Sequence, residues 1–187
     1  MRIIGGNRRG LRLAEVGEGD AAAHLRPTSD RVREAIFNLL INGGYGNPVA
    51  GARVLDLFAG TGAMGLEALS RGAAKVVFVD DGAKALTLLR ANVAKMRVEG
   101  ETRILRQDAR HLPENLGAPF TLVFLDPPYG KQLGEAALSA ALKHGWLAPD
   151  AMVVWEENLP PTPPAGLMQL DQRRYGETLV TLLGASA

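Results

Sequence analysis

The stretch VLDLFAGTGAMG, residues 54–65, joins a β-rich run to a helix-forming run through three glycines. Gly60, Gly62 and Gly65 have the spacing G-x-G-x-x-G. Glycines in this spacing let the backbone approach a ligand closely and direct the amino end of the following helix toward it. The stretch therefore predicts a strand, a nucleotide-binding loop and a helix. The alternative is a glycine turn that only packs the strand on the helix.

Strand and helix patterns alternate on the carboxyl side of this loop. Repeated β-α units favour an α/β fold, here a doubly wound, mostly parallel, seven-stranded Rossmann-like sheet that binds ligands beyond the carboxyl ends of its strands. The hydrophobic periodicity predicts strands at 53–58, 75–80, 102–108, 121–126 and 151–158, helices at 62–72, 82–96 and 134–145, and a final hairpin at 167–183.

The composition excludes several classes of protein. The 187 residues carry a net charge of +1 and contain no cysteine, which leaves no disulfide frame, no thiolate nucleophile and no cysteine-bound metal. His24, His111 and His144 are widely separated and form no metal-binding pattern. No apolar stretch is long enough to span a bilayer. We expect a cytoplasmic, monomeric protein with one domain, no metal and no membrane partner.

Acidic residues end the predicted strands. Asp56 precedes Gly60 within the first strand, where a carboxylate would repel a pyrophosphate but attract a cationic ligand such as a sulfonium amino acid. Asp80 ends the second strand, in the position from which an acid usually accepts ribose hydroxyls. Asp108 ends the third strand and Asp126 the fourth. Each acid alone could be a solvated charge, but four at consecutive strand ends indicate a ligand site.

These motifs resemble those of the class I S-adenosylmethionine-dependent methyltransferases. The resemblance covers VLDLFAGTGAMGLEALSRGA, VFVDD, RQDA and LDPPYG, and departs from the usual Glu-x-Asp pattern at Asp80 and Asp81. It implies S-adenosylmethionine as the cofactor, with S-adenosylhomocysteine as the product. The cofactor-binding residues that it implies are Asp56, Gly60 and Gly62 for the methionine part, Asp80 or Asp81 for the ribose, Asp108 and Ala109 for the adenine, and also Phe58.

The segment FLDPPYG, residues 124–130, is stiffened by two prolines. The Asp126 carboxylate and the Pro127 carbonyl can each accept one N–H of an exocyclic amine and direct its lone pair at a sulfonium methyl group. The carboxylate also offsets the positive charge that develops on nitrogen. Pro128 helps to hold the geometry, and Tyr129 can stack on a base. The alternative is simple strand termination, with Tyr129 in the core.

The amino-terminal segment MRIIGGNRRGLRL predicts a small β-hairpin studded with arginines. After a loop at 17–25, which we expect to be mobile, RPTSD predicts a helix from about Ser29 to Ile41, capped by Thr28 or Ser29. We therefore divide the single domain 1–187 into a basic extension, 1–27, and a catalytic core, 28–187.

RIIGGNRRGLRL, LRPTSDRVREAIFNLL and RRYGETLVTLL resemble the RsmD family, bacterial enzymes that methylate the exocyclic N2 of one guanine in 16S ribosomal RNA. The resemblance implies as partner this RNA, within the small ribosomal subunit or an assembly intermediate. It also implies that Thr28 closes over the methionine end of the cofactor. Tyr129 stands where phenylalanine is common in the family. The residues expected to contact RNA are Arg2, Arg8, Arg9, Arg12, Arg26 and Arg31, with Arg33 extending the basic surface.

Three other functions are compatible with parts of the pattern. A DNA adenine-N6 or other nucleic-acid amino-methyltransferase uses the same Asp-Pro-Pro-Tyr motif, but a DNA enzyme would normally need a target-recognition domain for which this chain has no room. A nicotinamide-dependent oxidoreductase would use the glycine loop alone. A non-catalytic RNA-binding assembly factor would keep the fold without the chemistry.

Overall fold

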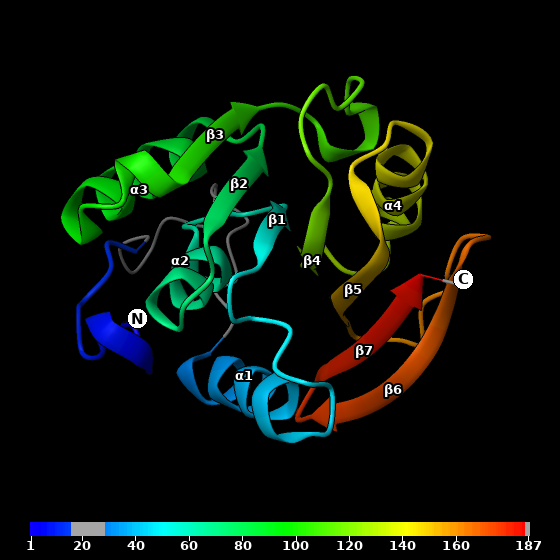
Figure 1. Cartoon of the computed structure of the whole chain (residues 1–187), viewed down its shortest axis with the longest axis horizontal. Helices are drawn as coiled ribbons and strands as arrows, with labels where there is room; N and C mark the ends of the chain where they lie inside the picture. The colour runs from blue at the N-terminus through cyan, green and yellow to red at the C-terminus, as the bar shows by residue number, and fades with distance from the viewer. Residues whose placement is uncertain (16–28, 186–187) are drawn as a thin grey trace.

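The computed structural model of the chain describes residues 1–15 and 29–185. Its described residues form a seven-stranded sheet in the order β3-β2-β1-β4-β5-β7-β6 (Figure 1). The strands from β3 to β5 are parallel, whereas β7 lies antiparallel between β5 and β6. This confirms the mostly parallel sheet. The strands are β1 (Arg53–Leu57), β2 (Lys75–Asp80), β3 (Thr102–Arg106), β4 (Phe120–Leu125), β5 (Leu147–Glu157), β6 (Leu167–Tyr175) and β7 (Thr178–Ala185).

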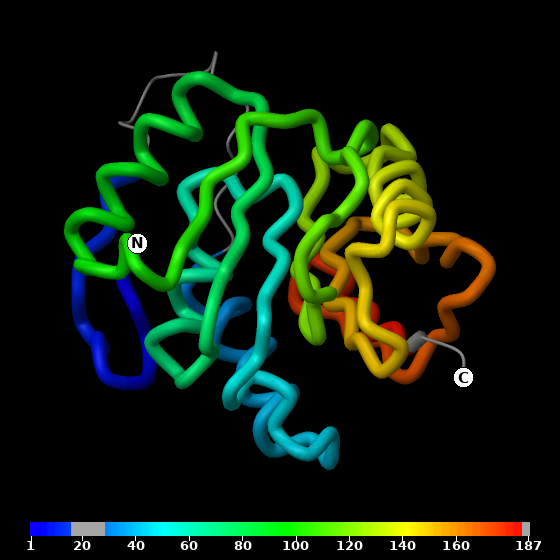
Figure 2. Tube along the Cα trace, turned by 45° about the horizontal axis from the view of Figure 1, so that its top comes forward, coloured from blue at the N-terminus to red at the C-terminus, as the bar shows by residue number. Residues whose placement is uncertain are grey.

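Helices cover both faces of the sheet, as Figures 1 and 2 show. Residues of α1, α2 and α3 share one hydrophobic cluster, and residues of α4 and η4 share the other. The sheet is therefore doubly wound. In the described part of the chain, no helix is both long and apolar enough to cross a bilayer. The helices are α1 (Asp30–Asn42), α2 (Ala63–Ser70), α3 (Ala83–Met96) and α4 (Leu133–Lys143), with 3-10 turns η1 (Gly6–Arg8), η3 (Glu99–Glu101) and η4 (Ala109–His111).

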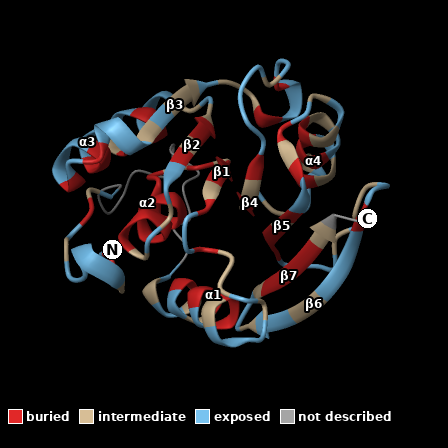
Figure 3. Cartoon of the chain, viewed as in Figure 1, coloured by how far each residue is buried: buried red, intermediate tan, exposed pale blue. Residues whose placement is uncertain are grey.

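The central strands are buried on both faces, as Figure 3 shows for β1 and β4. Successive side chains of a strand point to opposite faces. In β1, accordingly, Val54 packs in the cluster of α1, α2 and α3, whereas Leu55 and Leu57 pack in that of α4. Asp56 shares its face with Val54 and so points toward α2. Strand periodicity thus places one carboxylate directly beneath the helix that follows the glycine loop.

Some observed boundaries differ from the predicted ones for local reasons. The predicted first strand includes Phe58, but β1 ends one residue earlier because Phe58 has a φ of 58°. The predicted third strand includes Asp108, which instead caps η4 by accepting the Arg110 N–H. The start of α1 agrees with the prediction within one residue, and the Ser29 hydroxyl accepts the Val32 N–H at 3.2 Å as its cap.

The amino-terminal segment does not form the expected two-stranded hairpin. One isolated antiparallel bridge joins Arg2 and Arg12, and the chain between them turns through η1. The N–H groups of Ile4 and Gly5 are each donated to the Glu67 carboxylate at 2.8 Å. Pairing between the two arms is limited to a few backbone hydrogen bonds around the bridge, such as that from the Ile3 N–H to the Leu11 carbonyl at 2.9 Å. The predicted β-hairpin is not confirmed, and the segment is instead fastened to α2.

Candidate active site

The loop between β1 and α2 reverses direction through alternate left-handed residues. Phe58, Gly60 and Gly62 have φ values of 58°, 55° and 80°. The Gly62 N–H closes the turn by donating to the Ala59 carbonyl at 2.7 Å. A left-handed conformation is uncommon outside glycine and costs about 1–3 kcal/mol when it occurs in another residue. Such strain concentrates at functional sites, so the conformation of Phe58 marks this loop as one.

Two of the three motif glycines are required by close packing. A Cβ atom at Gly62 would lie 2.3 Å from Leu89 Cδ1, and one at Gly65 would lie 2.5 Å from Phe78 Cε1. Both distances are far below van der Waals contact. The packing role that the sequence offered as an alternative therefore applies to Gly62 and Gly65, and it holds the loop in a fixed place at the sheet edge.

Asp80 connects the loop to the end of β2. Its Oδ2 accepts the Gly60 N–H at 2.8 Å, and its Oδ1 accepts the Gly82 N–H at 2.8 Å. Burial raises the pKa of Asp80, while these two N–H donors oppose the increase. Asp81 is exposed. Of the two adjacent acids, Asp80 is thus the one whose carboxylate lies against the glycine loop.

Asp56 lies beneath the same loop rather than in front of it. Its residue is 3% exposed, and its Oδ2 accepts the Gly65 N–H at 2.9 Å in the first turn of α2. Burial raises the pKa of Asp56 well above its ordinary value, and the negative charges of Asp126 and Asp80 raise it further. The Asp56 carboxyl of β1 therefore feels the charges of the carboxylates that end β2 and follow β4. Their combined negative potential favours a cationic ligand at this edge.

The buried Asp56 carboxyl is expected to make folding less favourable as pH rises. Because its folded-state pKa is raised, the folded protein keeps a proton at pH values where the unfolded chain, with an ordinary aspartate pKa of about 3.9, has lost it. Stability therefore falls as pH increases through that interval. We expect Asp56→Asn to reduce this fall. The Tm of the variant minus the Tm of the wild type should therefore rise by at least about 2 °C between low and high pH, roughly the shift produced by 1 kcal/mol in a chain of this length.

Differential scanning calorimetry of both proteins between about pH 4 and pH 8 measures the effect, in the range where an aspartate with a raised pKa titrates. The variant Asp150→Asn removes an exposed acid of β5 and provides the control. Parallel Tm curves for wild type and Asp56→Asn would show that the Asp56 carboxyl carries no such linkage.

Asp108 follows β3 and is paired with a cation that the sequence analysis did not single out. Its carboxylate accepts the Arg110 backbone N–H at 2.9 Å and the Arg110 side chain at 2.6–3.1 Å. The Arg110 guanidinium lowers the pKa of Asp108 below its usual range. Ala109, the first residue of η4, is buried. The signal for this pairing was the Asp-x-Arg spacing, which fits a cap and a side-chain ion pair in one turn.

The Asp-Pro-Pro-Tyr segment leaves the sheet at the carboxyl end of β4. The Asp126 N–H reaches the Leu57 carbonyl at 3.5 Å, and Pro127 is buried. The Tyr129 hydroxyl lies 3.4 Å from Thr178 Oγ1, at the start of β7. Because β7 runs antiparallel to β5, its first residue lies at the carboxyl end of the parallel strands. Tyr129 is half-buried beside this edge rather than part of the core, which disfavours strand termination as its only role.

Asn92 supports the glycine loop from within α3, and its role was missed by the sequence analysis. The side chain is buried and uses all of its hydrogen-bonding groups except one lone pair. Its Nδ2 donates to the carbonyls of Thr61 at 2.9 Å and Ala14 at 3.1 Å, and its Oδ1 accepts the Ala14 N–H at 2.6 Å. One side chain thus holds both the glycine loop and the amino-terminal segment.

Replacing Asn92 with leucine is expected to weaken binding of S-adenosylhomocysteine by about tenfold, equivalent to about 1.4 kcal/mol. The change leaves the Thr61 carbonyl without its partner and loosens the loop. Ser70→Ala is the matched control, because Ser70 also holds the amino-terminal segment, through Gly5 and Arg8, but does not touch the loop. Isothermal titration should show near-normal affinity for Ser70→Ala. Equal losses of affinity in both variants would show that Asn92 supports the structure in general rather than the glycine loop.

The predicted RNA-binding arginines differ in their surroundings. Arg33 is fully buried, donating to Asp30 and to the Arg2 carbonyl and lying 3.7 Å from Glu67, so the expectation that it extends the basic surface is wrong. Its charge is used to hold α1, α2 and the amino-terminal segment together. The arginines that are exposed are Arg2, which lies 3.7 Å from Asp30, and Arg8, Arg9, Arg12 and Arg31. The predicted positions Arg26, Thr28 and His24, and the loop 17–25, lie outside the described residues.

The arrangement brings the glycine loop and the acids that follow it to one edge of the sheet. A tight glycine loop, the loop-facing acid Asp80 and the ionised Asp108 line the ends of consecutive strands. Asp126, close enough to Asp56 to raise its pKa, lies at the same edge. Such an edge can hold a cationic nucleoside and, beside it, an amine acceptor.

Comparisons with known proteins show the family of this chain. A family model described as Conserved hypothetical protein 95 matches residues 1–184. The chain is 38% identical over 168 residues to Ribosomal RNA small subunit methyltransferase D of Escherichia coli (strain K12), covering 88% of this chain and 80% of that protein. It is 37% identical over 161 residues to the protein of the same name in Haemophilus influenzae, covering 83% and 78%. The solved structure of Escherichia coli yhhF matches with a TM-score of 0.83 at 35% identity, covering 100% of this chain and 98% of that one.

Proposed function

Because the chain belongs to the Conserved hypothetical protein 95 family, the RsmD family of ribosomal RNA methyltransferases, we propose that it methylates the exocyclic N2 amine of one guanine in 16S ribosomal RNA. The observation that carries the proposal is the meeting of two motifs at one edge. The glycine loop and the Asp-Pro-Pro-Tyr segment follow adjacent strands, β1 and β4, whose last residues Leu57 and Leu125 are paired.

S-adenosylmethionine is the proposed cofactor, and when bound it supplies an electrophilic methyl group on a sulfonium. The residues present fit such a molecule. The Asp80 carboxylate lies beside the loop, where it can accept hydrogen bonds from the ribose hydroxyls. Asp108 and Ala109 follow the next strand, where they can contact the adenine. The carboxylates of Asp56 and Asp126 favour the positive charge. In this proposal Asp56 acts mainly by fixing α2, because its residue is 3% exposed and burial raises the pKa of its carboxyl.

The acceptor amine is oriented by Asp126 and the Pro127 carbonyl. Each accepts one N–H, which aligns the nitrogen lone pair with the methyl group and removes conformations that cannot react. The Asp126 carboxylate stabilises the charge that forms on nitrogen and takes the released proton. Tyr129 holds the base by stacking, and the proximity of its hydroxyl to Thr178 restricts the ring.

The choice of guanine rests on the resemblance of the amino-terminal motifs to the RsmD family. The names of the relatives support the small subunit, because they specify a small-subunit methyltransferase. The exposed Arg8, Arg9 and Arg12 are available for phosphate contacts in such a substrate. A protein-bearing particle is the preferred substrate in this proposal, because the family resemblance points to the subunit or an assembly intermediate.

The decisive experiment maps the methylated nucleotide. Purified protein and tritiated S-adenosylmethionine are incubated with small ribosomal subunits that lack the modification, with free 16S RNA and with adenine-containing duplex DNA. We expect label in the subunits, at the N2 of a single guanine. Label only in DNA would favour a DNA amino-methyltransferase, and no transfer to any substrate would favour a non-catalytic assembly factor.

A further inference from the structure

The outer face of α3 carries only one sign of charge. The helix contains no acidic residue, and its cations Lys84, Arg90 and Lys95 are all exposed. The remaining exposed positions of the helix are alanine or threonine. A solvated helix usually mixes charges of both signs, because opposite charges one turn apart stabilise it. The absence of acids therefore leaves a positive surface that the stability of the helix does not explain.

The edge strand β3 lies beside α3 and carries cations on both of its faces: Arg106 shares the face toward α3 with Ile104, and Arg103 shares the opposite face with Leu105. Arg103 and Arg106 are exposed on β3, and Arg97 is exposed just after α3. Within residues 1–15 and 29–185, none of these three, nor Arg90 or Lys95, forms an ion pair. Several other arginines are paired: Arg33 and Arg71 with Glu67, Arg110 with Asp108, and Arg173 with Asp171.

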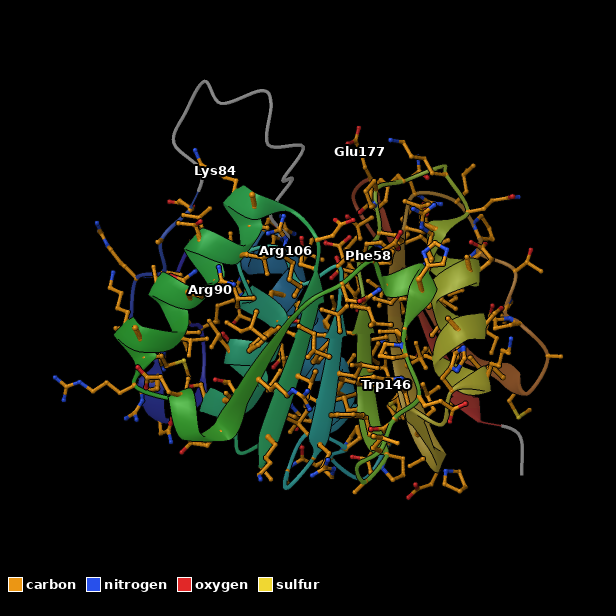
Figure 4. All side chains as sticks on the ribbon, turned by 90° about the horizontal axis from the view of Figure 1, so that it is seen from above. Phe58, Lys84, Arg90, Arg106, Trp146 and Glu177 are labelled. Atoms are coloured by element: carbon orange, nitrogen blue, oxygen red, sulfur yellow. The ribbon has the colours of Figure 1, made fainter. Side chains whose placement is uncertain are left out.

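The position of this surface relates it to the candidate active site. Arg106 is the register partner of Asp80 at the carboxyl end of β3, and Lys84 lies in the first turn of α3, after Asp80. Figure 4 shows Lys84, Arg90 and Arg106 on the side of α3 and β3, to the left of Phe58. The cations thus extend from the edge that holds the glycine loop along the outside of the molecule.

The same surface meets the amino-terminal segment. Ala14 is hydrogen-bonded to Asn92 of α3, so the chain that carries Arg12 runs beside this helix. Figures 1 and 2 both show the amino-terminal segment next to α3. The exposed arginines of the segment and the cations of α3 therefore lie on one side of the molecule.

We propose that the outer face of α3 and the edge strand β3 form a second binding surface for the RNA phosphate backbone, adjoining the arginines of the amino-terminal segment. The inference rests on the proposed function, because it concerns the same RNA. Its dimensions fit: α3 has 14 residues and is about 20 Å long, which is long enough to reach several phosphates along one RNA strand.

Another hollow lined by cations is less suited to a polyanion. It has a volume of about 480 Å³ and lies between η4 and α4, with Arg110, Lys143 and His144 among its lining residues. Its arginine is already bound to Asp108, and His144 lies 3.7 Å from Glu114. The arginine of this hollow is thus paired, whereas Arg90, Arg103 and Arg106 form no ion pair within the described residues.

The test removes one cation from each element, in the double variant Arg90→Gln/Arg103→Gln. We expect its affinity for unmodified small subunits, measured by filter binding, to fall at least about tenfold near physiological salt. The slope of log K against log salt should fall in magnitude by about 1.4–1.8, since each lost phosphate contact contributes about 0.7–0.9. The variant Arg90→Lys/Arg103→Lys keeps the charges and should retain most of the affinity, which excludes misfolding as the cause.

Lys143→Gln/Arg174→Gln is the matched control, because it removes two exposed cations of α4 and β6 and changes the net charge equally. Its affinity and salt slope should stay near those of the wild type. An unchanged affinity in Arg90→Gln/Arg103→Gln, or an equal loss in the control, would overturn the inference. Binding is measured without methyl transfer, so the two proposals can fail separately. A wild-type protein that binds subunits but does not methylate them contradicts the proposed function, while the variants still test whether α3 and β3 bind RNA.

Discussion

Asp126→Asn is expected to lower kcat for methyl transfer by about 10³-fold, within the range of losses for a group that both orients and deprotonates a nucleophile. Asparagine has nearly the same size and can still accept one N–H. It cannot offset the positive charge that develops on the amine nitrogen, and it cannot take the proton. The affinity for S-adenosylhomocysteine should stay within about threefold, or about 0.7 kcal/mol, because the product lacks the amine that Asp126 binds.

The measurement combines single-turnover transfer of tritiated methyl to small subunits with calorimetric titration of S-adenosylhomocysteine. Asp150→Asn, an exposed acid on β5, is the control for loss of a negative charge and should react as the wild type does. Undiminished turnover of Asp126→Asn would refute the mechanism. A large loss of affinity for S-adenosylhomocysteine would instead show that Asp126 helps to bind the cofactor.

The second large effect is expected from Asp80→Asn, which should weaken binding of S-adenosylhomocysteine by about 100-fold. The change removes the charge that strengthens hydrogen bonds from ribose hydroxyls, worth about 1.5–3 kcal/mol for bonds to charged groups. It also leaves only one side-chain oxygen where two now accept the N–H groups of Gly60 and Gly82. The loop and the ligand are therefore both affected.

Asp81→Asn is the matched control, one residue away and exposed. We expect its affinity to change by less than about threefold, or about 0.7 kcal/mol. A larger loss of affinity in Asp81→Asn than in Asp80→Asn would show that Asp81, not Asp80, binds the ribose. The same titration with NAD should give no heat in the wild type, whereas NAD binding with no response to S-adenosylhomocysteine would support the oxidoreductase that the glycine spacing alone allows.

Local patterns predicted much of the fold because the forces behind them act over short distances along the chain. Period-3.6 apolar residues and a serine cap predicted α1 to within one residue. Proline chemistry predicted the end of β4 at Asp126, one residue beyond its observed end at Leu125. The acids at strand ends could be placed at one edge because parallel strands end on the same side of a sheet.

The misses involve partners that are remote in sequence. The sequence predicted Arg33 as part of the basic surface. In the structure its guanidinium is buried against Glu67 and the Arg2 carbonyl. Asn92 occurs in a helix pattern in which nothing marks it as a loop support, and its partners Thr61 and Ala14 lie 31 and 78 residues away. The hydrophobic periodicity of a sequence gives no information about such long-range contacts.

By itself the sequence determined the α/β class, the glycine loop and the stiff Asp-Pro-Pro-Tyr segment, since backbone freedom and side-chain period are properties of neighbouring residues. Only the tertiary structure decided which charges are available. It brought Asp80 rather than Asp81 against Gly60, and within the described residues it left Arg90, Arg103 and Arg106 without an ion pair. The physical reason is that burial and pairing, which set the energy of a charge, depend on residues that only the folded sheet brings together.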